Sequence, residues 1–597
     1  MPGPEIIAVL ILLAVLIGLL ILEPFTPDVS AMLILMALGA TCYLPFLPKL
    51  LEPDLLFSGF SSQAVVALVG IMVIASAIDR TGILHPLALW ISRLGKQSAA
   101  AKTALLSLAT GSISAIIQNL GAAALCMPLA NRIAAHGKIP LQQLLMPMGF
   151  AAILGGSITM IGAGPLILLN DLIPRGMEPF HLLDVAPLGL TLLLSGLAYW
   201  ALFHKWLLPE KLASETSEDI YRETYGVDPT YSYWRWPAEL DQMPVGELEN
   251  RFGCHVIAIA TPQIRLSPHR EVCIPGRATI AVLSTPQELK KLQEHTSAVR
   301  LSEHLELEEA LSPANAGFAE LVVPPASPLI GNTIREIRIR RSYGITPLAI
   351  HRGDTVIKSN LRDCSLGAGD SILCHIQWMD LANLEESRNF TVITRDFPHI
   401  TKMPEKAGLA WLWLAIGFGA TLFGIAPTGY ALLLAAIGMV ASGILSMEDA
   451  YRAISWKTVF LLAALIPLGV AVADTGTAEW IANQGLALLG SEPAPVLIFS
   501  LVAFVGAALG LMMSNLGAAV VLVPLAAQLG VSSGVDARLL VLVAAVSVSH
   551  VFALPTQQVN ALIMGPGGFS TRDFIRAGSG LTLLAIVITI AFGVAWV

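Results

Sequence analysis

The sequence predicts an α-helical polytopic membrane protein with two inverted repeats and re-entrant hairpins, interrupted by an α/β cytosolic insert. Apolar residues make up 55% of the chain and charged residues 13%, with a mean hydropathy of +0.70. A soluble protein carries about 25% charged residues. Residues 208–406 hold 48 of the 78 charged side chains, which separates the membrane repeats 1–207 and 407–597 from the insert. A short polar segment also occurs once in each repeat.

The repeated segment reads QNLGAA at residues 118–123 and SNLGAA at residues 514–519. A PLA triplet follows in both copies, at 128–130 and 524–526. Each copy places an amide and a glycine inside apolar sequence, which is costly in a bilayer unless the polar groups line a cavity or bind a ligand. A duplicated membrane unit with a polar break in each half indicates the binding site of a transporter.

The apolar runs predict the membrane elements in chain order, since a spanning helix needs about 20 apolar residues. In the first repeat we expect spans near 5–22, 31–47, 63–79, 144–170 and 186–205, a surface helix near 81–96 and a hairpin over 101–136. In the second repeat we expect spans near 409–425, 427–447, 458–474, 539–565 and 578–597, and a hairpin over 494–531. The two polar segments form the hairpin tips.

Five full crossings in each repeat require the second repeat to be inverted relative to the first. If the insert is cytoplasmic and both termini are external, eleven basic residues lie on the inside and three on the outside, as the positive-inside rule requires. The inside set is Arg80, Arg93, Lys96, Lys102, Arg132, Lys138, Lys205, Arg452, Lys457, Arg572 and Arg576, and the outside set is Lys49, Arg175 and Arg538.

Two of the predicted spans are broken, at residues 155–165 and 553–558, by glycine and proline. These residues release backbone carbonyls and amides. Carbonyl oxygens suit Na⁺ and half-helix N-termini suit an anion. The two hairpin tips and the two breaks are therefore expected to converge near the membrane midplane. Glycine and proline that only permit kinks and close packing are the alternative for any single break.

With these tips and breaks, both membrane repeats resemble the divalent anion/sodium symporter family. The resemblance implies that the tips hold an anion and that each repeat forms a sodium site. The implied substrate-binding residues are Gln118, Asn119, Leu120, Gly121, Ser514, Asn515, Leu516, Gly517 and Thr556. The implied sodium ligands are Ser114, Asn119 and Gly162 in one site and Gly510, Asn515 and Pro555 in the other.

The tips depart from that family's pattern. Leu120 and Leu516 stand where the family usually has threonine, and Gln118 replaces a serine. The two leucines therefore supply no hydroxyl donor to an anion. Gln118 offers an amide donor instead, and the backbone amides of Gly121 and Gly517 are expected to compensate. His550 stands in an apolar span five residues before Pro555. It is either a packing residue or a residue that contacts the substrate or carries a proton.

The insert resembles the C-terminal regulatory domain of potassium-conductance regulators (TrkA-C) over residues 318–395, where short apolar strands alternate with a charged helix. Residues 240–298 resemble a degenerate second copy. Such domains pair and bind small ligands, so the resemblance implies a homodimer and a nucleotide ligand on the insert. An assembly module without a ligand remains the alternative. No GxGxxG loop is present, and no basic patch suits nucleic acid.

The sequence therefore predicts a multi-pass protein of the cell membrane that takes up a small divalent anion with Na⁺ as the coupling ion. Sulfate is the first expected substrate, because the linked regulatory domains resemble the sulfate-type branch, and a dicarboxylate is the second. A regulated ion channel and an H⁺-coupled anion transporter are the alternatives. No motif predicts an enzyme or a metal site other than that for Na⁺.

Overall fold

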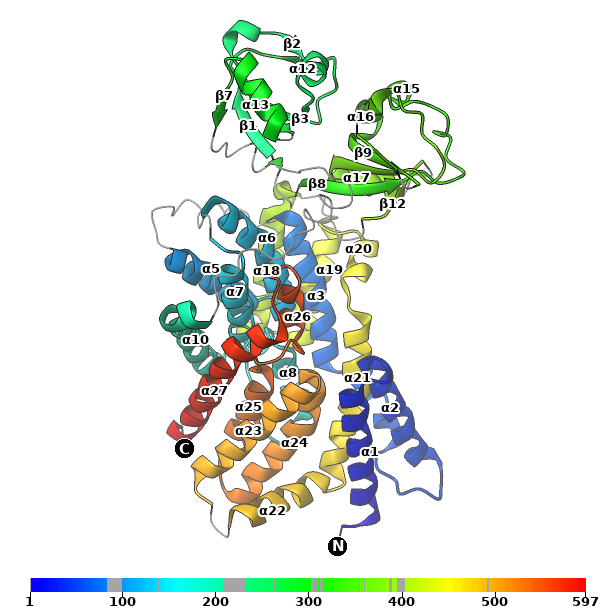
Figure 1. Ribbon diagram of the computed structural model, residues 1–597. Coiled ribbons are helices and arrows are strands. Elements are labelled where there is room, and N and C mark those ends of the chain that lie inside the picture. The colour runs from blue at the N-terminus through cyan, green and yellow to red at the C-terminus, as the bar shows by residue number, and fades with distance from the viewer. Residues whose placement is uncertain are drawn as a thin grey trace. The chain divides into compact units, whose positions relative to one another are not determined.

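The computed structural model of the chain divides into two compact units, residues 1–212 with 402–597 and residues 213–401 (Figure 1). It describes residues 2–82, 99–137, 139–174, 176–207, 231–261, 264–284, 286–301, 307, 310–311, 315–353, 355–358, 360–385, 389–394, 403–490 and 493–596. The expected surface helix near 81–96, with Arg93 and Lys96, lies almost wholly outside this set. Lys138, Arg175 and the side chains of Arg132 and Lys205 also lie outside it.

The first unit is helical. Before the insert it contains α1 (Pro4–Leu22), α2 (Pro27–Tyr43), α3 (Gln63–Thr81), α5 (Ala99–Ser114), α6 (Asn119–Gly137), α7 (Gln142–Gly155), α8 (Gly164–Ile167), α9 (Leu169–Leu172) and α10 (Ala186–Leu207). After the insert it contains α18 (Ala407–Leu422), α19 (Thr428–Ala441), α20 (Met447–Ala453), α21 (Trp456–Asp474), α22 (Thr477–Leu489), α23 (Pro495–Met512), α24 (Asn515–Ser533), α25 (Ala537–Ser549), α26 (Gln558–Met564) and α27 (Thr571–Ala595).

Seven helices of the described chain are long and apolar enough to cross a membrane: α1, α3, α10, α21, α23, α24 and α27. Shorter apolar helices, α2, α18, α19 and α25, accompany them. Each expected hairpin is a pair of helices, α5 with α6 and α23 with α24, and the chain between the two helices of each pair is only a few residues long. Both expected breaks are present, because helix is lost between α7 and α8 and between α25 and α26.

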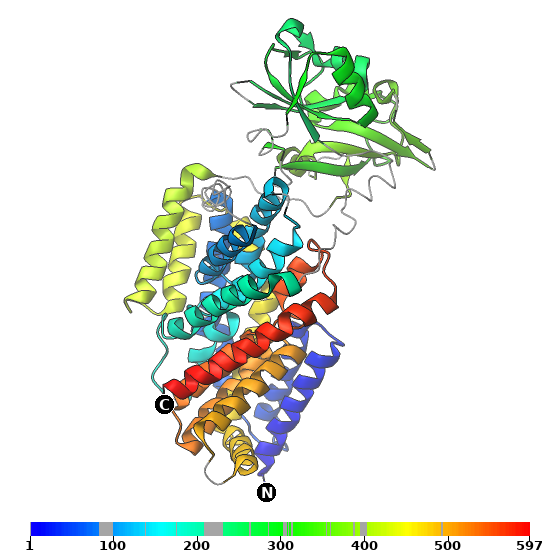
Figure 2. The same ribbon diagram turned by 60° about the vertical axis from the view of Figure 1, so that its left-hand side comes forward.

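The two halves of this unit exchange packing partners. Helix α2 packs on α21, and α19 packs on α3 (Figure 1). Helix α26 contacts α6 and α7, whereas α8 contacts α24 and α25, so the short helix after each break lies against the hairpin of the other half. Helices α10 and α27 also lie side by side (Figure 2). The broken segments are thereby held between the halves.

Glycine permits these close approaches. A Cβ atom on Gly70 of α3 would lie 2.8 Å from the Leu432 carbonyl carbon of α19. A Cβ atom on Gly59 would lie 2.0 Å from the Ala463 carbonyl oxygen of α21. Small residues let membrane helices approach at backbone distance, where van der Waals packing replaces the hydrophobic effect as the driving force. These two contacts therefore need glycine.

The second unit contains two five-stranded antiparallel sheets. The first has the order β4-β3-β6-β1-β7, with β1 (Tyr231–Arg235), β3 (His255–Ala260), β4 (Ile264–Leu266), β6 (Thr279–Leu283) and β7 (Val299–Leu301). The second has the order β10-β9-β11-β8-β12, with β8 (Ala316–Val322), β9 (Thr346–Arg352), β10 (Thr355–Ile357), β11 (Ser371–Gln377) and β12 (Thr391–Val392). A two-stranded pair, β2 (Met243–Pro244) with β5 (Cys273–Ile274), accompanies them.

Each sheet is buried on both faces along its central strands. Helices α12 (Val245–Phe252) and α13 (Pro286–His295) accompany the first sheet. Helices α15 (Ile334–Ile337), α16 (Ile339–Tyr343) and α17 (Trp378–Glu385) accompany the second. The remaining faces meet in an apolar cluster that joins Ile257 and Ala281 of the first sheet to Leu348 and Phe318 of the second.

The charged helix expected within residues 318–395 is two short helices, α15 and α16. Arg338 has φ of 52°, in the left-handed region, and separates α15 from α16. Such a conformation is uncommon for a residue with a Cβ atom and ends a helix. Thr333 and Glu336 form a capping box at the start of α15, so the first turn is closed by its own side chains.

Candidate functional site

The first tip and the first break are joined by buried hydroxyl groups. Ser114, the last residue of α5, is fully buried and donates from Oγ to the Ala152 carbonyl of α7 at 2.6 Å. Thr159, within the break, donates from Oγ1 to the Ala115 carbonyl at 2.6 Å. The same Oγ1 accepts the peptide N–H of Gly162 at 3.2 Å. These bonds fix the unwound chain against the hairpin.

The Asn119 amide lies at the centre of this junction. One of its terminal atoms lies 2.9 Å from Ser114 Oγ, 3.0 Å from the Gly162 carbonyl oxygen and 3.2 Å from the Ala152 carbonyl oxygen. With nitrogen in this position, the amide donates hydrogen bonds to the surrounding oxygens. With oxygen there, four oxygen atoms face one another, an arrangement that a bound cation stabilises. Three residues expected to form one sodium site are therefore in contact: Ser114, Asn119 and Gly162.

Glycine shapes this oxygen cluster. A Cβ atom on Gly156 would lie 1.8 Å from Asn119 Oδ1, and one on Gly162 would lie 2.6 Å from the Ser114 carbonyl oxygen. A Cβ atom on Gly155 would lie 2.1 Å from the Gly111 carbonyl oxygen of α5. The glycines of the break therefore let two backbones and an amide meet at one point, which a chain with side chains could not do.

The second tip is more open. Ser514, Asn515 and Leu516 are all partly exposed, and the Asn515 side chain makes no hydrogen bond with the described residues. Gly510 lies against the Val548 carbonyl oxygen, and a Cβ atom added to Gly510 would lie 2.6 Å from that oxygen. In the described chain no hydrogen bond joins Asn515 to Gly510 or Pro555. The second expected sodium set is therefore not gathered as the first one is.

Polar residues that the sequence analysis did not assign lie at the second break. The Gln557 amide donates to the Ser549 carbonyl, and Asn560 Nδ2 donates to the Leu554 carbonyl at 3.0 Å. Asn560 is fully buried, and its Oδ1 has no hydrogen-bond partner among the described residues. Thr556 is exposed. The signal for Asn560 was available, since it is a polar residue on the short apolar helix that follows Pro555.

His550 joins the two breaks. It is 2% exposed, and its Nε2 lies 3.1 Å from Ser157 Oγ in the first break. Its Nδ1 has no partner among the described residues, and its ring stacks on Phe552 with centroids 6.1 Å apart. The sequence placed His550 near the second break but did not predict its contact with Ser157.

The second tip reaches the first break through apolar atoms. A Cβ atom on Gly164, the first residue of α8, would lie 2.5 Å from Leu516 Cδ2. On the first tip, Leu120 is 39% exposed. The leucines that replace hydroxyl residues at the tips therefore occupy two different surroundings, one packed on the opposite half and one open.

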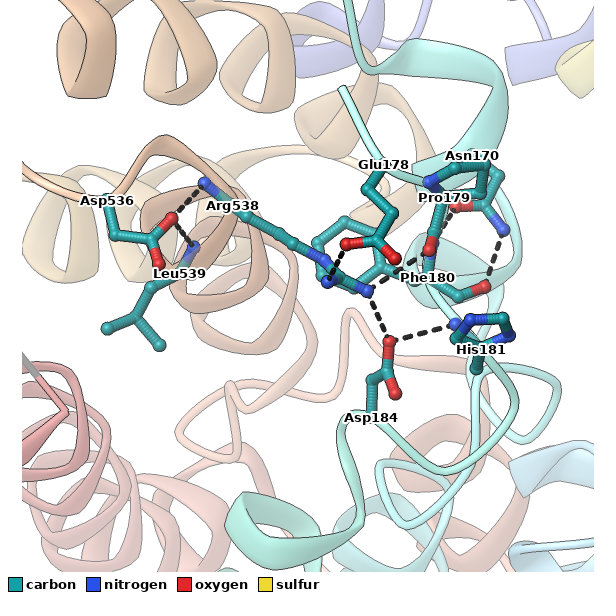
Figure 3. Close-up of polar contacts among 9 residues, drawn as sticks. All are labelled: Asn170, Glu178, Pro179, Phe180, His181, Asp184, Asp536, Arg538 and Leu539. Carbon is teal, nitrogen blue, oxygen red and sulfur yellow. Dashed lines mark hydrogen bonds and ion pairs between the residues drawn. The ribbon is translucent and has the colours of Figure 1, made fainter. Parts of the chain in front are cut away.

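An ion cluster joins the halves where α25 begins (Figure 3). The Arg538 guanidinium donates to Asp184 at 2.6 Å and to Glu178 at 3.1 Å, both in the loop after α9. It also lies over the ring of Phe180, 4.9 Å from the centroid. The Asp536 side chain caps the same helix by accepting the Arg538 N–H at 2.8 Å. One guanidinium that pairs with two carboxylates of the same loop fixes the loop to the helix.

A second ion pair between the halves joins Arg80 of α3 to Asp449 of α20. The carbonyl of Arg80 also accepts the N–H of Met403, which precedes α18. Hydrogen bonding from Ser446, together with the Arg80 guanidinium, holds the pKa of Asp449 below its usual value. The carboxylate is therefore charged at neutral pH and keeps the pair formed.

A protein-family model described as CitMHS, citrate transporter, matches residues 17–547. That match spans most of the chain and the first broken segment, and it ends shortly before the second. The chain belongs to the citrate transporter family. The protein is accordingly a multi-pass membrane transporter and not an enzyme. The resemblance of the tips and breaks to the divalent anion/sodium symporter family also indicated a transporter. The family model that matches the chain is that of citrate transporters.

Two full-length relatives of this citrate transporter family member are bacterial. An uncharacterized transporter of Synechocystis is 27% identical over 612 residues, covering 98% of this chain and 96% of the relative. An uncharacterized transporter of Escherichia coli is 25% identical over 611 residues, covering 98% of each chain. A probable sodium/sulfate cotransporter of Chlamydomonas reinhardtii is 25% identical over 287 residues, 45% of this chain and 31% of the relative.

Proposed function

We propose that this transporter takes up a small divalent anion together with Na⁺ by alternating access, with sulfate as the first candidate substrate and a dicarboxylate as the second. The observation that carries the proposal is the oxygen cluster of Ser114, Asn119, Ala152 and Gly162 at the first tip. The similarity to a sodium/sulfate cotransporter supports the choice of ion and anion. The citrate transporter family supports a carboxylate as the second candidate.

The chemistry of the cluster favours a monovalent cation. Its oxygens are neutral hydroxyl, amide and carbonyl groups, and among the described residues no group of three or more His, Cys, Asp or Glu residues could hold a metal ion. A neutral cage suits Na⁺ better than a divalent ion, which needs carboxylates. We propose that the Asn119 amide donates to these oxygens when no ion is bound and turns its oxygen toward Na⁺ when one is bound.

The anion is proposed to lie between the two tips. Helices α6 and α24 begin at Asn119 and Asn515. The first N–H groups that donate within these helices are those of Ala122 and Ala518, so the N–H groups before them have no helical acceptor. Free N–H groups and the positive end of a helix dipole attract an anion. Backbone donors of this kind are proposed to replace the hydroxyl groups that Leu120 and Leu516 do not supply.

The repeated order of helices and the exchanged packing of the breaks support two inverted repeats. We propose that the second sodium site, at Gly510, Asn515 and Pro555, forms only when the second tip closes. In the structure the Asn515 side chain is partly exposed and without a hydrogen bond to the described residues, as an open site requires. Alternating access then consists of closing one tip while the other opens.

The insert is proposed to be a cytoplasmic pair of TrkA-C-like domains that regulates transport and assembles a homodimer, with both termini of the chain external. Two similar five-stranded sheets support the pair. A nucleotide ligand has less support, because two basic residues of the insert are engaged in ion pairs. Arg335 pairs with Asp363 at 2.5 Å, and the largely buried Arg340 pairs with Glu249 of the first domain at 2.8 Å. These pairs favour the assembly role.

A proton is the second candidate for the coupling ion, and His550 is the observation that favours it. Its Nε2 contacts Ser157 in the first break, while its Nδ1 is buried without a partner among the described residues. A buried imidazole that touches both breaks could carry a proton between them. Replacement of His550 by Gln would then abolish uptake driven by a pH gradient and leave Na⁺-driven uptake intact.

The proposal is tested by thermal unfolding of the purified protein with and without Na⁺ and sulfate. Na⁺ is expected to raise the unfolding temperature of the native protein, since a ligand stabilises the state that binds it. Asn119→Ala should remove most of this Na⁺ response, and Asn515→Ala should remove the further response to sulfate. Asn483→Ala, at an exposed position of α22, is the control. An unchanged Na⁺ response in Asn119→Ala would show that the cluster serves packing only.

A further inference from the structure

A cavity of about 60 Å³ lies between α5, α7 and α10, away from the tips and breaks. Its walls come from the first half of α5, the first turns of α7 and the last turns of α10. Alanines of α5 and α10 leave the space open. Of the described residues that line the cavity, none is Asp, Glu, Lys or Arg.

Two residues that line this cavity carry a buried polar atom without a hydrogen-bond partner among the described residues. Ser107 of α5 is 1% exposed and Trp200 of α10 is 5% exposed. Neither Ser107 Oγ nor Trp200 Nε1 has a partner among the described residues. A buried polar group without a partner costs about 1–3 kcal/mol, so two of them in one cavity indicate a ligand that satisfies both.

The chemistry of these atoms restricts the ligand. An indole N–H only donates, so the ligand must present an acceptor oxygen to Trp200. The Trp200 ring is held by Phe150 and Tyr199, at centroid distances of 5.8 and 6.1 Å, and its N–H therefore has a fixed position. Of the described lining residues only His204 can carry a charge. Neutral ester and glycerol oxygens therefore suit these walls better than a phosphate or a carboxylate, which would lose its hydration there.

The position of the cavity indicates a lipid. The lining residues of α10 lie in its last turns, just before the chain leaves the helical unit at residue 212. On the same helix Leu194, Leu202 and Phe203 are exposed, as expected for side chains that face acyl chains. An opening at the end of a spanning helix lies at the level of the lipid glycerol and ester groups.

We propose that this cavity binds the glycerol ester region of a membrane phospholipid. An ester carbonyl accepts the Trp200 N–H, a second ester or glycerol oxygen bonds to the Ser107 hydroxyl, and the acyl chains leave along the exposed face of α10. The phosphate group remains outside, in the headgroup layer. A lipid held in this way joins α5, the outer helix of the first hairpin, to α10.

The test compares an ester with an ether phospholipid. The full-length protein is purified in detergent and freed of lipid, and its unfolding temperature is measured with dioleoyl phosphatidylcholine and with the diether analogue, which lacks both carbonyl acceptors. The ester lipid is expected to stabilise the native protein at roughly tenfold lower concentration than the ether lipid. A factor of about ten in affinity is what one or two buried hydrogen bonds contribute.

Two variants link the effect to the cavity. Trp200→Phe keeps the ring but removes the N–H, and Ser107→Ala removes the hydroxyl. Both should fold, because each deletes an unsatisfied group, and both should reduce the preference for the ester lipid. Trp206→Phe and Ser112→Ala, at exposed positions of α10 and α5, are the matched controls. Equal responses to the two lipids, or an ester preference unchanged in both variants, would overturn the proposal.

Discussion

His375 is expected to make the insert sensitive to mild acid. It lies on β11, is 1% exposed, and its ring meets Tyr231 of the first sheet and Phe318 of the second at centroid distances of 5.7 Å. Neither ring nitrogen has a hydrogen-bond partner among the described residues. Burial, with a smaller contribution from Arg340, lowers the pKa of His375 from 6.5 to about 4. A charge placed between the two sheets would have nothing to solvate it.

The sign and size of the effect follow from this pKa. The folded form holds a proton less tightly than the unfolded form, so the unfolded form binds more protons between pH 6.5 and pH 4, and stability falls as pH falls through that window. With a folded pKa of about 4, the loss is about 2 kcal/mol between pH 7 and pH 5 and approaches about 3 kcal/mol below pH 4.

Hydrogen–deuterium exchange of the full-length protein, followed by mass spectrometry of peptides from β9 and β11, measures this loss. After correction for intrinsic exchange, protection of these strands should fall about 30-fold between pH 7 and pH 5. His375→Leu should abolish the fall, because it replaces unsatisfied polar atoms with an apolar side chain of similar size. His295→Leu, at an exposed position of α13, is the control. Equal protection at both pH values in the native protein would refute the reasoning.

Three further predictions concern the helical unit. Gly156→Ala places a Cβ atom 1.8 Å from Asn119 Oδ1, so the Na⁺ concentration needed to raise the unfolding temperature should increase at least tenfold. Gly419→Ala, with no atom within 4 Å of its Cβ, should leave that concentration unchanged. Arg538→Gln should destabilise the protein by about 1–3 kcal/mol and increase exchange in the loop 173–185, because two carboxylates lose their partner; an unchanged unfolding temperature in low salt would contradict this. Deleting residues 212–400 with a short linker should leave substrate binding intact and change the transport rate; a well-folded deletion protein without substrate binding would show that the insert forms part of the site.

The helices and the first site could be predicted from the sequence because the bilayer restricts the choices. An apolar run that crosses lipid must satisfy its own backbone, so the runs near 63–79 and 458–474 become α3 and α21. For the same reason an amide inside apolar sequence, as at Asn119, must find polar partners, which the structure places on Ser114, Ala152 and Gly162.

The remaining features depend on contacts between segments that are distant in the chain. Ser157 and His550 are 393 residues apart, and Arg538 lies 354 residues from Asp184, so their pairing follows from how the halves pack and not from any local pattern. The split of the charged helix at Arg338 depends on one left-handed backbone conformation. The similarity of the two tips predicted two equal sites, whereas Asn515 lacks the neighbours that Asn119 has.

The central claim is that the protein moves a divalent anion with Na⁺, and flux into proteoliposomes tests it most directly. The purified full-length protein is reconstituted, and uptake of radiolabelled sulfate is measured with an inward Na⁺ gradient and with the same concentration of K⁺. Uptake should saturate with sulfate, require the Na⁺ gradient and be lost in Asn119→Ala, and unlabelled succinate should compete if a dicarboxylate shares the site. Uptake that is equal in Na⁺ and K⁺, or that rises linearly with sulfate as through a channel, would contradict it.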